Sequence, residues 1–163
     1  MSLELSETPT VNVGMLIRRP PEAVFEALAD PSVTTRFWFT NSSGSLDQGA
    51  NVQWDWEMYG VSAEVAVQEA EENRRLLFDW GPKDGPEDAA TTVEVNFVPH
   101  GDDSTYVQVT ETGFSGSPDE IVARAIDSTG GFTMVLCALK ALLEHDVELS
   151  AVADKAPPPG VEV

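Results

Sequence analysis

Hydrophobic and polar positions alternate along most of the middle of the chain. Between Asn51 and Phe114, several short stretches carry an apolar residue at every second position, and Gly, Pro, Asn and Asp separate these stretches. This period places neighbouring side chains on opposite faces of a strand. Successive strands with short turns favour a mostly antiparallel sheet. Its predicted apolar face carries Val52, Trp54, Trp56, Leu76, Phe78, Trp80, Val93, Val95, Phe97, Val107 and Val109.

A first strand and two short helices are predicted ahead of this region. Alternation over residues 11–18 indicates the strand, and the prolines that follow end it. A proline in the first turn and apolar residues at helical spacing predict a helix over residues 21–29. Asp30 can cap a second short helix that continues to about Trp38. Residues 41–44 are expected to form a loop.

The longest helical pattern lies after the strands. Ser117 and Glu120 flank Pro118 in the arrangement of a capping box, which predicts a helix continuing to about His145. Residues 129–131, which include two glycines, indicate either a kink or a true break. One apolar stripe follows them, formed by Phe132, Val135, Leu136, Leu139, Leu142 and Leu143.

Length and composition fit one domain. The chain has 163 residues, of which 42% are hydrophobic, and this is enough for a single sizeable core. We expect a disordered N-terminus over residues 1–9, one domain over residues 10–149, and a disordered Pro-rich tail over residues 150–163.

The charge of the chain is strongly negative. Twenty-eight acidic residues against nine basic ones give a formal net charge of -19. Such a field repels nucleic acids and anionic lipid headgroups, so neither is an expected partner. It fits an ordinary solvated acidic surface or a high-salt host. No apolar run approaches the ~18 residues of a transmembrane helix, and the N-terminus lacks the pattern of a secretion signal. We therefore expect a cytoplasmic protein without membrane insertion.

Residues that commonly carry chemistry are few. Cys137 is the single cysteine, which excludes an internal disulfide, and its place in an apolar helix predicts a small buried side chain. His100 and His145 are far apart and match no zinc spacing. The glycines of residues 113–116 lack the spacing of a nucleotide-binding loop. We therefore predict no cofactor, no metal and no assigned catalytic residue.

Seven segments together carry a family resemblance, by their order and spacing. They are RPPEAVFEALADP (19–31), FW (37–38), LDQGANVQW (46–54), RLLFDW (75–80), TVEVNF (92–97), TYVQVTETGF (105–114) and GGFTMVLCALKALLE (130–144). Over about residues 10–147 the chain resembles the SRPBCC (START-like) superfamily, in particular the group similar to the activator of the Hsp-90 ATPase.

The resemblance implies an α+β helix-grip fold. In such a fold, a curved antiparallel sheet of about six to seven strands wraps around a long C-terminal helix, and two short helices follow strand one. The chain departs from its relatives at Phe132, where they usually have Trp. The eukaryotic chaperone activator has an additional N-terminal domain, for which this chain has no room. Chaperone stimulation is therefore weakly supported.

The helix-grip fold implies an apolar cavity between the sheet and the C-terminal helix. Pockets of this kind are mostly apolar, with a few polar groups that orient the ligand. The alternative is that the same side chains simply fill a core. The candidate ligand-binding residues are Trp54, Trp56, Phe78, Trp80, Val95, Phe97, Val109, Glu111, Phe132, Val135 and Leu139.

Glu111 is the one polar residue in this set. Its position in the alternation turns it inward beside Val107 and Val109. A buried carboxylate needs a partner or carries a raised pKa. Glu111 is therefore interpreted either as a ligand anchor or acid–base group, or as the structural partner of an arginine such as Arg36 or Arg124.

Three functions follow from these features. The first is a small protein that binds a hydrophobic or amphipathic small molecule in the cavity. The second is an enzyme of the cyclase or aromatase kind found in the same superfamily, which uses a cavity carboxylate. The third is a chaperone-associated interaction module. A homodimer is left open.

Overall fold

The middle of the chain forms one antiparallel sheet of seven strands, as the alternating pattern predicts. The computed structural model describes residues 2–163. The strands lie in the order β1-β7-β6-β5-β4-β3-β2, and every neighbouring pair is antiparallel. They are β1 (Val11–Ile17), β2 (Asn41–Ser42), β3 (Asn51–Trp56), β4 (Val61–Glu71), β5 (Arg75–Pro82), β6 (Thr91–His100) and β7 (Ser104–Thr112).

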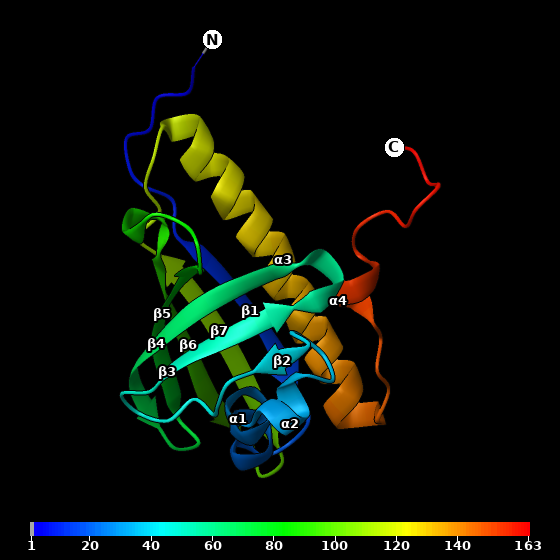
Figure 1. Cartoon of the computed structure of the whole chain (residues 1–163). Helices are drawn as coiled ribbons and strands as arrows, with labels where there is room; N and C mark the ends of the chain where they lie inside the picture. The colour runs from blue at the N-terminus through cyan, green and yellow to red at the C-terminus, as the bar shows by residue number, and fades with distance from the viewer. Residues whose placement is uncertain (1) are drawn as a thin grey trace.

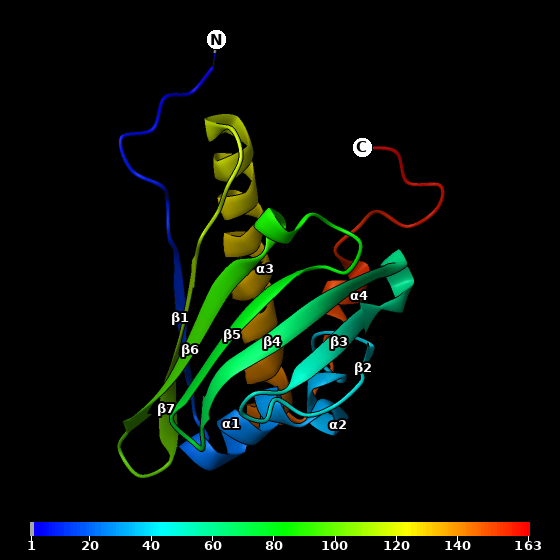
Figure 2. The same cartoon turned by 60° about the vertical axis from the view of Figure 1, so that its left-hand side comes forward.

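The helices lie around this sheet as a helix-grip fold requires. The long helix α3 (Pro118–His145) crosses one face of the sheet, and its first turns extend beyond the sheet's edge (Figures 1 and 2). Two short helices, α1 (Pro21–Ala29) and α2 (Pro31–Thr34), follow β1 and lie at the opposite end. Two 3-10 turns, η1 (Glu57–Tyr59) and η2 (Glu87–Ala89), precede β4 and β6. The predicted fold class is confirmed.

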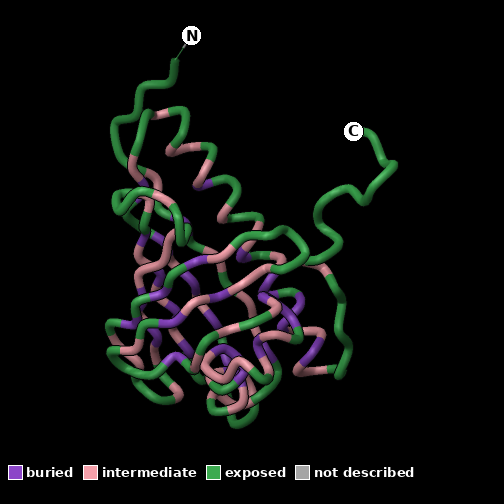
Figure 3. The backbone as a smooth tube through the Cα atoms, viewed as in Figure 1, coloured by how far each residue is buried: buried purple, intermediate pink, exposed green. Residues whose placement is uncertain are grey.

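The core lies between the sheet and the C-terminal part of α3. All six residues of the predicted helix stripe are buried or packed against the core, and Leu139 is fully buried. Figure 3 shows buried residues where sheet and helix meet, whereas the first turns of α3 carry mainly exposed and intermediate residues. Burying a side chain such as that of Leu139 contributes about 1.5–3 kcal/mol. The packed region thus fixes one half of α3 on the sheet.

Residues 129–131 do not interrupt α3, which runs as one helix from Pro118 to His145. A glycine inside a helix costs about 1 kcal/mol relative to alanine. The capping box offsets part of that cost: Glu120 N–H donates to Ser117 Oγ at 3.2 Å, and Ser117 N–H donates to Glu120 Oε2 at 2.8 Å. Of the two expected alternatives, the true break is therefore wrong.

Cys137 is exposed, so the prediction of a buried thiol is wrong. The apolar stripe from Phe132 to Leu143 faces the sheet. At 100° per residue, position 137 points roughly away from the centre of that stripe. The apolar neighbours of Cys137 in the sequence therefore did not predict which face of the helix it occupies.

Two short segments also differ from expectation. Asn41 and Ser42, expected in a loop, pair with Asp55 and Trp54 as the edge strand β2. Hydrogen bonds to Asp55 hold this strand, including one from Thr40 N–H to the Asp55 carbonyl at 2.8 Å. In the tail, for which the sequence predicts disorder, residues 151–154 form the helical turn α4 (Ala151–Asp154).

By length and composition alone, α3 could cross a membrane, and it is the only helix of residues 2–163 that could. Core helices satisfy the same criteria. Its stripe from Phe132 to Leu142 is buried against the sheet, as in the core helix of a water-soluble domain.

Candidate functional site

Two adjoining hollows lie at one end of the sheet, beneath the first half of α3. The smaller has a volume of about 300 Å³ and the larger about 670 Å³. The ends of β3, β5 and β7 and the starts of β4 and β6 meet here, opposite residues 123–135 of α3. Both hollows are lined by Trp56, Val61, Trp80, Asp127 and Ser128.

Aromatic rings form the wall between the hollows and the core. The ring centroid of Trp80 lies 5.6 Å from that of Phe132, 5.9 Å from that of Trp38 and 6.4 Å from that of Trp56. These rings come from β5, α3, the segment after α2, and β3. Aromatic contacts at such distances add about 0.5–1.5 kcal/mol each beyond their buried area. The wall is therefore built from four separate parts of the chain.

Glu111 lies in the floor of the larger hollow and is 2% exposed. Trp80 Nε1–H donates to Glu111 Oε2 at 3.1 Å, and the Thr91 hydroxyl donates to the same oxygen. The other oxygen, Oε1, is buried and has no hydrogen-bond partner among residues 2–163. Leaving a buried polar group unsatisfied costs about 1–3 kcal/mol, and more when the group is charged. This carboxylate is held in place but only half satisfied.

Of the two interpretations of Glu111, the pairing with Arg36 or Arg124 is wrong. Arg36 pairs instead with Asp146 and Glu148, just after α3. Arg124 lines the larger hollow, but its guanidinium donates to the carbonyls of Ala89 at 2.7 Å and Ser115 at 3.3 Å. Backbone carbonyls before β6 and before α3 thus hold the arginine that lines the larger hollow.

The guanidinium of Arg124 also lies 5.6 Å from the ring centroid of Phe114, a cation–π distance. At the rim of the smaller hollow, Lys155 Nζ lies 3.5 Å from Asp127 Oδ1. Both cations that line the hollows are thus engaged with other groups.

The C-terminal segment closes one side of the smaller hollow. Val152, in α4, lines this hollow and packs against the core, and the Tyr59 hydroxyl donates to the Val152 carbonyl. Residues beyond the predicted domain therefore contribute to the site.

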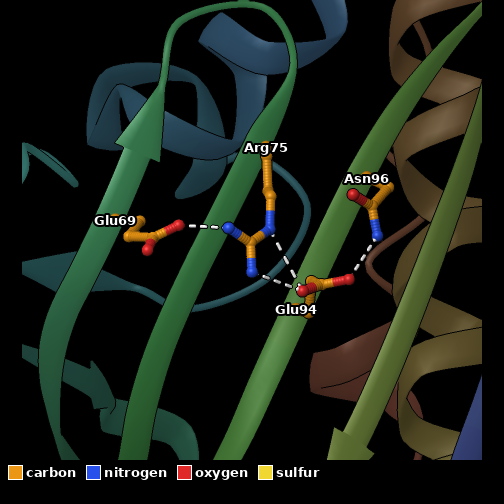
Figure 4. Close-up of polar contacts among 4 residues, drawn as sticks. All are labelled: Glu69, Arg75, Glu94 and Asn96. Atoms are coloured by element: carbon orange, nitrogen blue, oxygen red, sulfur yellow. Dashed lines mark hydrogen bonds and ion pairs between the residues drawn. The ribbon is translucent and has the colours of Figure 1, made fainter.

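The opposite face of the sheet has a different character. Arg75 donates to Glu94 Oε2 from Nη2 at 2.7 Å and from Nε at 3.1 Å, and it also pairs with Glu69 (Figure 4). Hydrogen bonds from Asn96 and from Arg75 lower the pKa of Glu94. A hollow of about 630 Å³ on this face is lined by polar residues such as Gln53, Glu64 and Asp79. On this face Glu69, Asp79 and Glu94 all accept hydrogen bonds from neighbouring side chains, and none of the three is buried.

The structure divides the predicted ligand-binding residues into two groups. Trp56, Trp80, Glu111, Phe132 and Val135 line the hollows. The others line neither hollow and are packed in the core; they are Trp54, Phe78, Val95, Phe97, Val109 and Leu139. A ligand contact by any of these residues stays a prediction.

Several residues at the hollows were not predicted from the sequence. Trp38 and Phe114 come from short connecting segments whose place depends on the tertiary fold, and Thr91 is the first residue of β6. Gly131 also lines the smaller hollow. The sequence did mark Gly131, but as an interruption of a helix. Within residues 2–163, no group of three or more His, Cys, Asp or Glu side chains could hold a metal ion.

The fold and the hollows define a helix-grip domain with an open space between sheet and helix. Residues 18–144 match the family described as Activator of Hsp90 ATPase homolog 1-like protein. The chain therefore belongs to this family, as its resemblance to the SRPBCC superfamily implies. Comparison with curated proteins gives no match.

Similar solved structures share the fold. Protein SSP2350 from Staphylococcus saprophyticus is 28% identical, with 86% of this chain and 96% of that chain covered and a TM-score of 0.72. The Aha1 dimer from Colwellia psychrerythraea is 19% identical, with 84% and 97% covered and a TM-score of 0.70. DynU16, a putative protein in the dynemicin biosynthetic locus, is 21% identical, with 85% of this chain but 48% of that chain covered and a TM-score of 0.73.

Proposed function

We propose that this protein binds a hydrophobic or amphipathic small molecule in the hollows between the sheet and α3. The observation that carries the proposal is the buried, half-satisfied carboxylate of Glu111 in the floor of an otherwise largely apolar space. Binding pockets for small molecules combine apolar walls with a few polar groups that fix orientation. Trp56, Trp80 and Phe132 supply the walls and Glu111 supplies the polar group.

Apolar burial provides the driving force. A ligand that removes about 200 Å² of apolar surface from water gains about 5 kcal/mol at 25 cal/mol per Å². The loss of translational and rotational freedom on association offsets much of this gain. The affinity of the ligand then depends on how well its apolar part fits against the aromatic wall and on one well-placed polar contact.

The two glycines of α3 allow a matched test of the site. A Cβ added at Gly130 or at Gly131 would meet no atom within 4 Å. Gly131 lines the smaller hollow, whereas Gly130 is exposed and lines neither hollow. Leucine at position 131 should therefore fill ligand space, and leucine at position 130 should not. Both changes replace a helix-destabilising glycine.

The measurement is binding of a panel of aromatic and lipid-like compounds, followed by Trp fluorescence and thermal shift. Wild type and Gly130→Leu should bind the same compounds with similar affinity, and Gly131→Leu should lose at least tenfold. A wild type that responds to no compound, or two variants that bind equally well, would rule out this site.

The second candidate is an enzyme of the cyclase or aromatase kind. One observation favours it: Glu111 is held by two donors on one oxygen while the other has no partner, which suits a positioned acid or base. The fold neighbour DynU16 comes from a biosynthetic locus, and we carry that setting over only as a proposal. Turnover by wild type that Glu111→Gln abolishes, with binding retained, would support the enzyme. Absence of any turnover would leave the binder.

The proposal extends to the partners and the cellular location of the protein. A homodimer is in keeping with the dimeric Aha1 neighbour, and a cytoplasmic location with the acidic composition. Contact with an Hsp-90-type chaperone rests on the family description alone, and a pull-down with an ATPase assay tests it.

A further inference from the structure

Glu111 Oε1 is a buried acceptor with no hydrogen-bond partner among residues 2–163. Oε2 already accepts hydrogen bonds from Trp80 and Thr91, which fix the orientation of the carboxylate. Oε1 is the remaining acceptor, and a carboxylate acceptor is best satisfied by an N–H or O–H donor. Because Oε1 is covered in the structure, the donor must displace lining side chains slightly, and the ligand's own affinity must supply that energy.

A positively charged donor suits this position better than a neutral one. A buried carboxylate is strongly favoured by an opposite charge that hydrogen-bonds to it. The protein does not supply one, since Arg124 is held by the Ala89 and Ser115 carbonyls and Lys155 lies beside Asp127. Glu111 therefore has no ion pair with an arginine or lysine of residues 2–163.

The aromatic walls of the hollows and the negative net charge of the protein also favour a cationic ligand. Cations are attracted to the faces of Trp rings within about 6 Å, and desolvated cases gain about 2 kcal/mol or more. Trp56 and Trp80 line both hollows, and Phe132 adjoins Trp80. The net charge of -19 raises the local concentration of cations and lowers that of anions.

We propose that the hollows take a protonated amine carried on an aromatic or alkyl body, with the ammonium group at Glu111 and the body against Trp56 and Trp80. This inference rests on the proposed function and names the class of ligand that the site selects. It predicts that an amine binds more tightly than an alcohol or a carboxylate that has the same aromatic or alkyl group.

Three matched probes test the inference: 1-naphthylmethylamine, 1-naphthylmethanol and 1-naphthoate. Isothermal titration calorimetry measures their binding to the full chain at pH 7, in low salt and in 0.5 M NaCl. We expect the amine to bind at least tenfold more tightly than the alcohol, and the carboxylate to bind most weakly. Salt screens the general attraction of the acidic protein for cations, so the preference for the amine should persist in 0.5 M NaCl.

Two variants assign the preference to the site. Glu111→Gln keeps an acceptor for Trp80 and Thr91 but removes the charge, so its affinities for the amine and for the alcohol should differ by less than twofold. Glu64→Gln makes the same change of net charge on the opposite, exposed face and should bind like wild type.

The outcomes separate the inference from the proposed function. If the alcohol or the carboxylate binds wild type as tightly as the amine, the hollow binds ligands but the cationic class is wrong. If the amine preference survives in Glu111→Gln, or falls equally in Glu64→Gln, it comes from the overall charge and the inference is wrong. If none of the three probes binds, the inference and the binding site fail together.

Discussion

Replacing Glu111 with Gln should stabilise the protein in the absence of ligand. The amide oxygen of Gln can accept the same hydrogen bonds from Trp80 Nε1 and from the Thr91 hydroxyl. The substitution preserves shape and volume. What disappears is a buried charge that forms no ion pair with any of residues 2–163. If the carboxylate stabilised the fold, Glu111→Gln would instead lower the free energy of unfolding.

The size of the stabilisation by Glu111→Gln can be estimated from what happens at each of the two carboxylate oxygens. An unsatisfied buried group costs about 1–3 kcal/mol, with charged groups at the upper end. The amide N–H₂ that replaces Oε1 also lacks a partner, so only part of this cost is removed. We therefore expect the free energy of unfolding to rise by about 1 kcal/mol. With a urea m value of about 2 kcal/mol/M, the midpoint should rise by about 0.5 M.

Urea denaturation followed by Trp fluorescence at pH 7 measures the change. Glu111→Ala is the control: it removes both hydrogen bonds, leaves Trp80 and Thr91 without an acceptor, and should destabilise by about 2–3 kcal/mol. The reasoning is refuted if Glu111→Gln lowers the midpoint by 0.5 M or more, because the carboxylate would then stabilise the fold and a functional reason for it would not be needed.

Three further predictions concern other parts of α3. Burial disfavours the charge of Glu144, but hydrogen bonds from Lys140 Nζ and the Arg18 N–H outweigh it and lower the pKa of Glu144. Such a group stabilises above its unfolded pKa of about 4.3 and loses that effect as pH falls through the folded value. Glu144→Gln should therefore cost about 1–2 kcal/mol at pH 7 and progressively less below pH 4; a cost independent of pH in urea titrations would contradict this. Gly130→Ala should stabilise by about 0.5–1 kcal/mol in the same assay, since its Cβ meets nothing within 4 Å, and a lowered midpoint would count against an open helix surface there. The exposed thiol of Cys137 should react with Ellman's reagent in the folded protein; reaction only after unfolding would show that the thiol is covered.

The sheet and the long helix were predictable because each has one buried face. A period of two in the strands and a stripe at helical spacing in α3 both record which side meets the core. Val65, Phe78 and Leu139 are accordingly buried. β2 left no such pattern, because Asn41 is held by Asp55 and Ser42 pairs with Trp54, and neither residue buries an apolar face.

The extent of the hollows was not predictable from the same pattern. Trp54 and Trp56 lie two positions apart on one face of β3, and the alternating pattern predicts the same environment for both. Trp54 is 1% exposed and its ring centroid lies 4.6 Å from that of Phe39. Trp56 lines both hollows. Alternation tells which face a residue occupies, whereas the position at which α3 leaves the sheet decides whether that residue meets core or space.

Two of the local costs in this chain lie at the hollows. Gly131 introduces a destabilising residue into the middle of a long helix, and Glu111 places an unpartnered oxygen in a buried position. Both residues line the adjoining hollows, and the packed half of the domain contains no comparable buried, unpartnered side-chain atom within residues 2–163. Sequences generally satisfy local rules throughout a fold and break them where function requires it. A side chain at position 131 would occupy the space, and an apolar residue at position 111 would remove its polar group. Under the proposed function, both costs have one reason: Gly131 leaves room for a ligand in the hollows, and Glu111 offers it a polar contact.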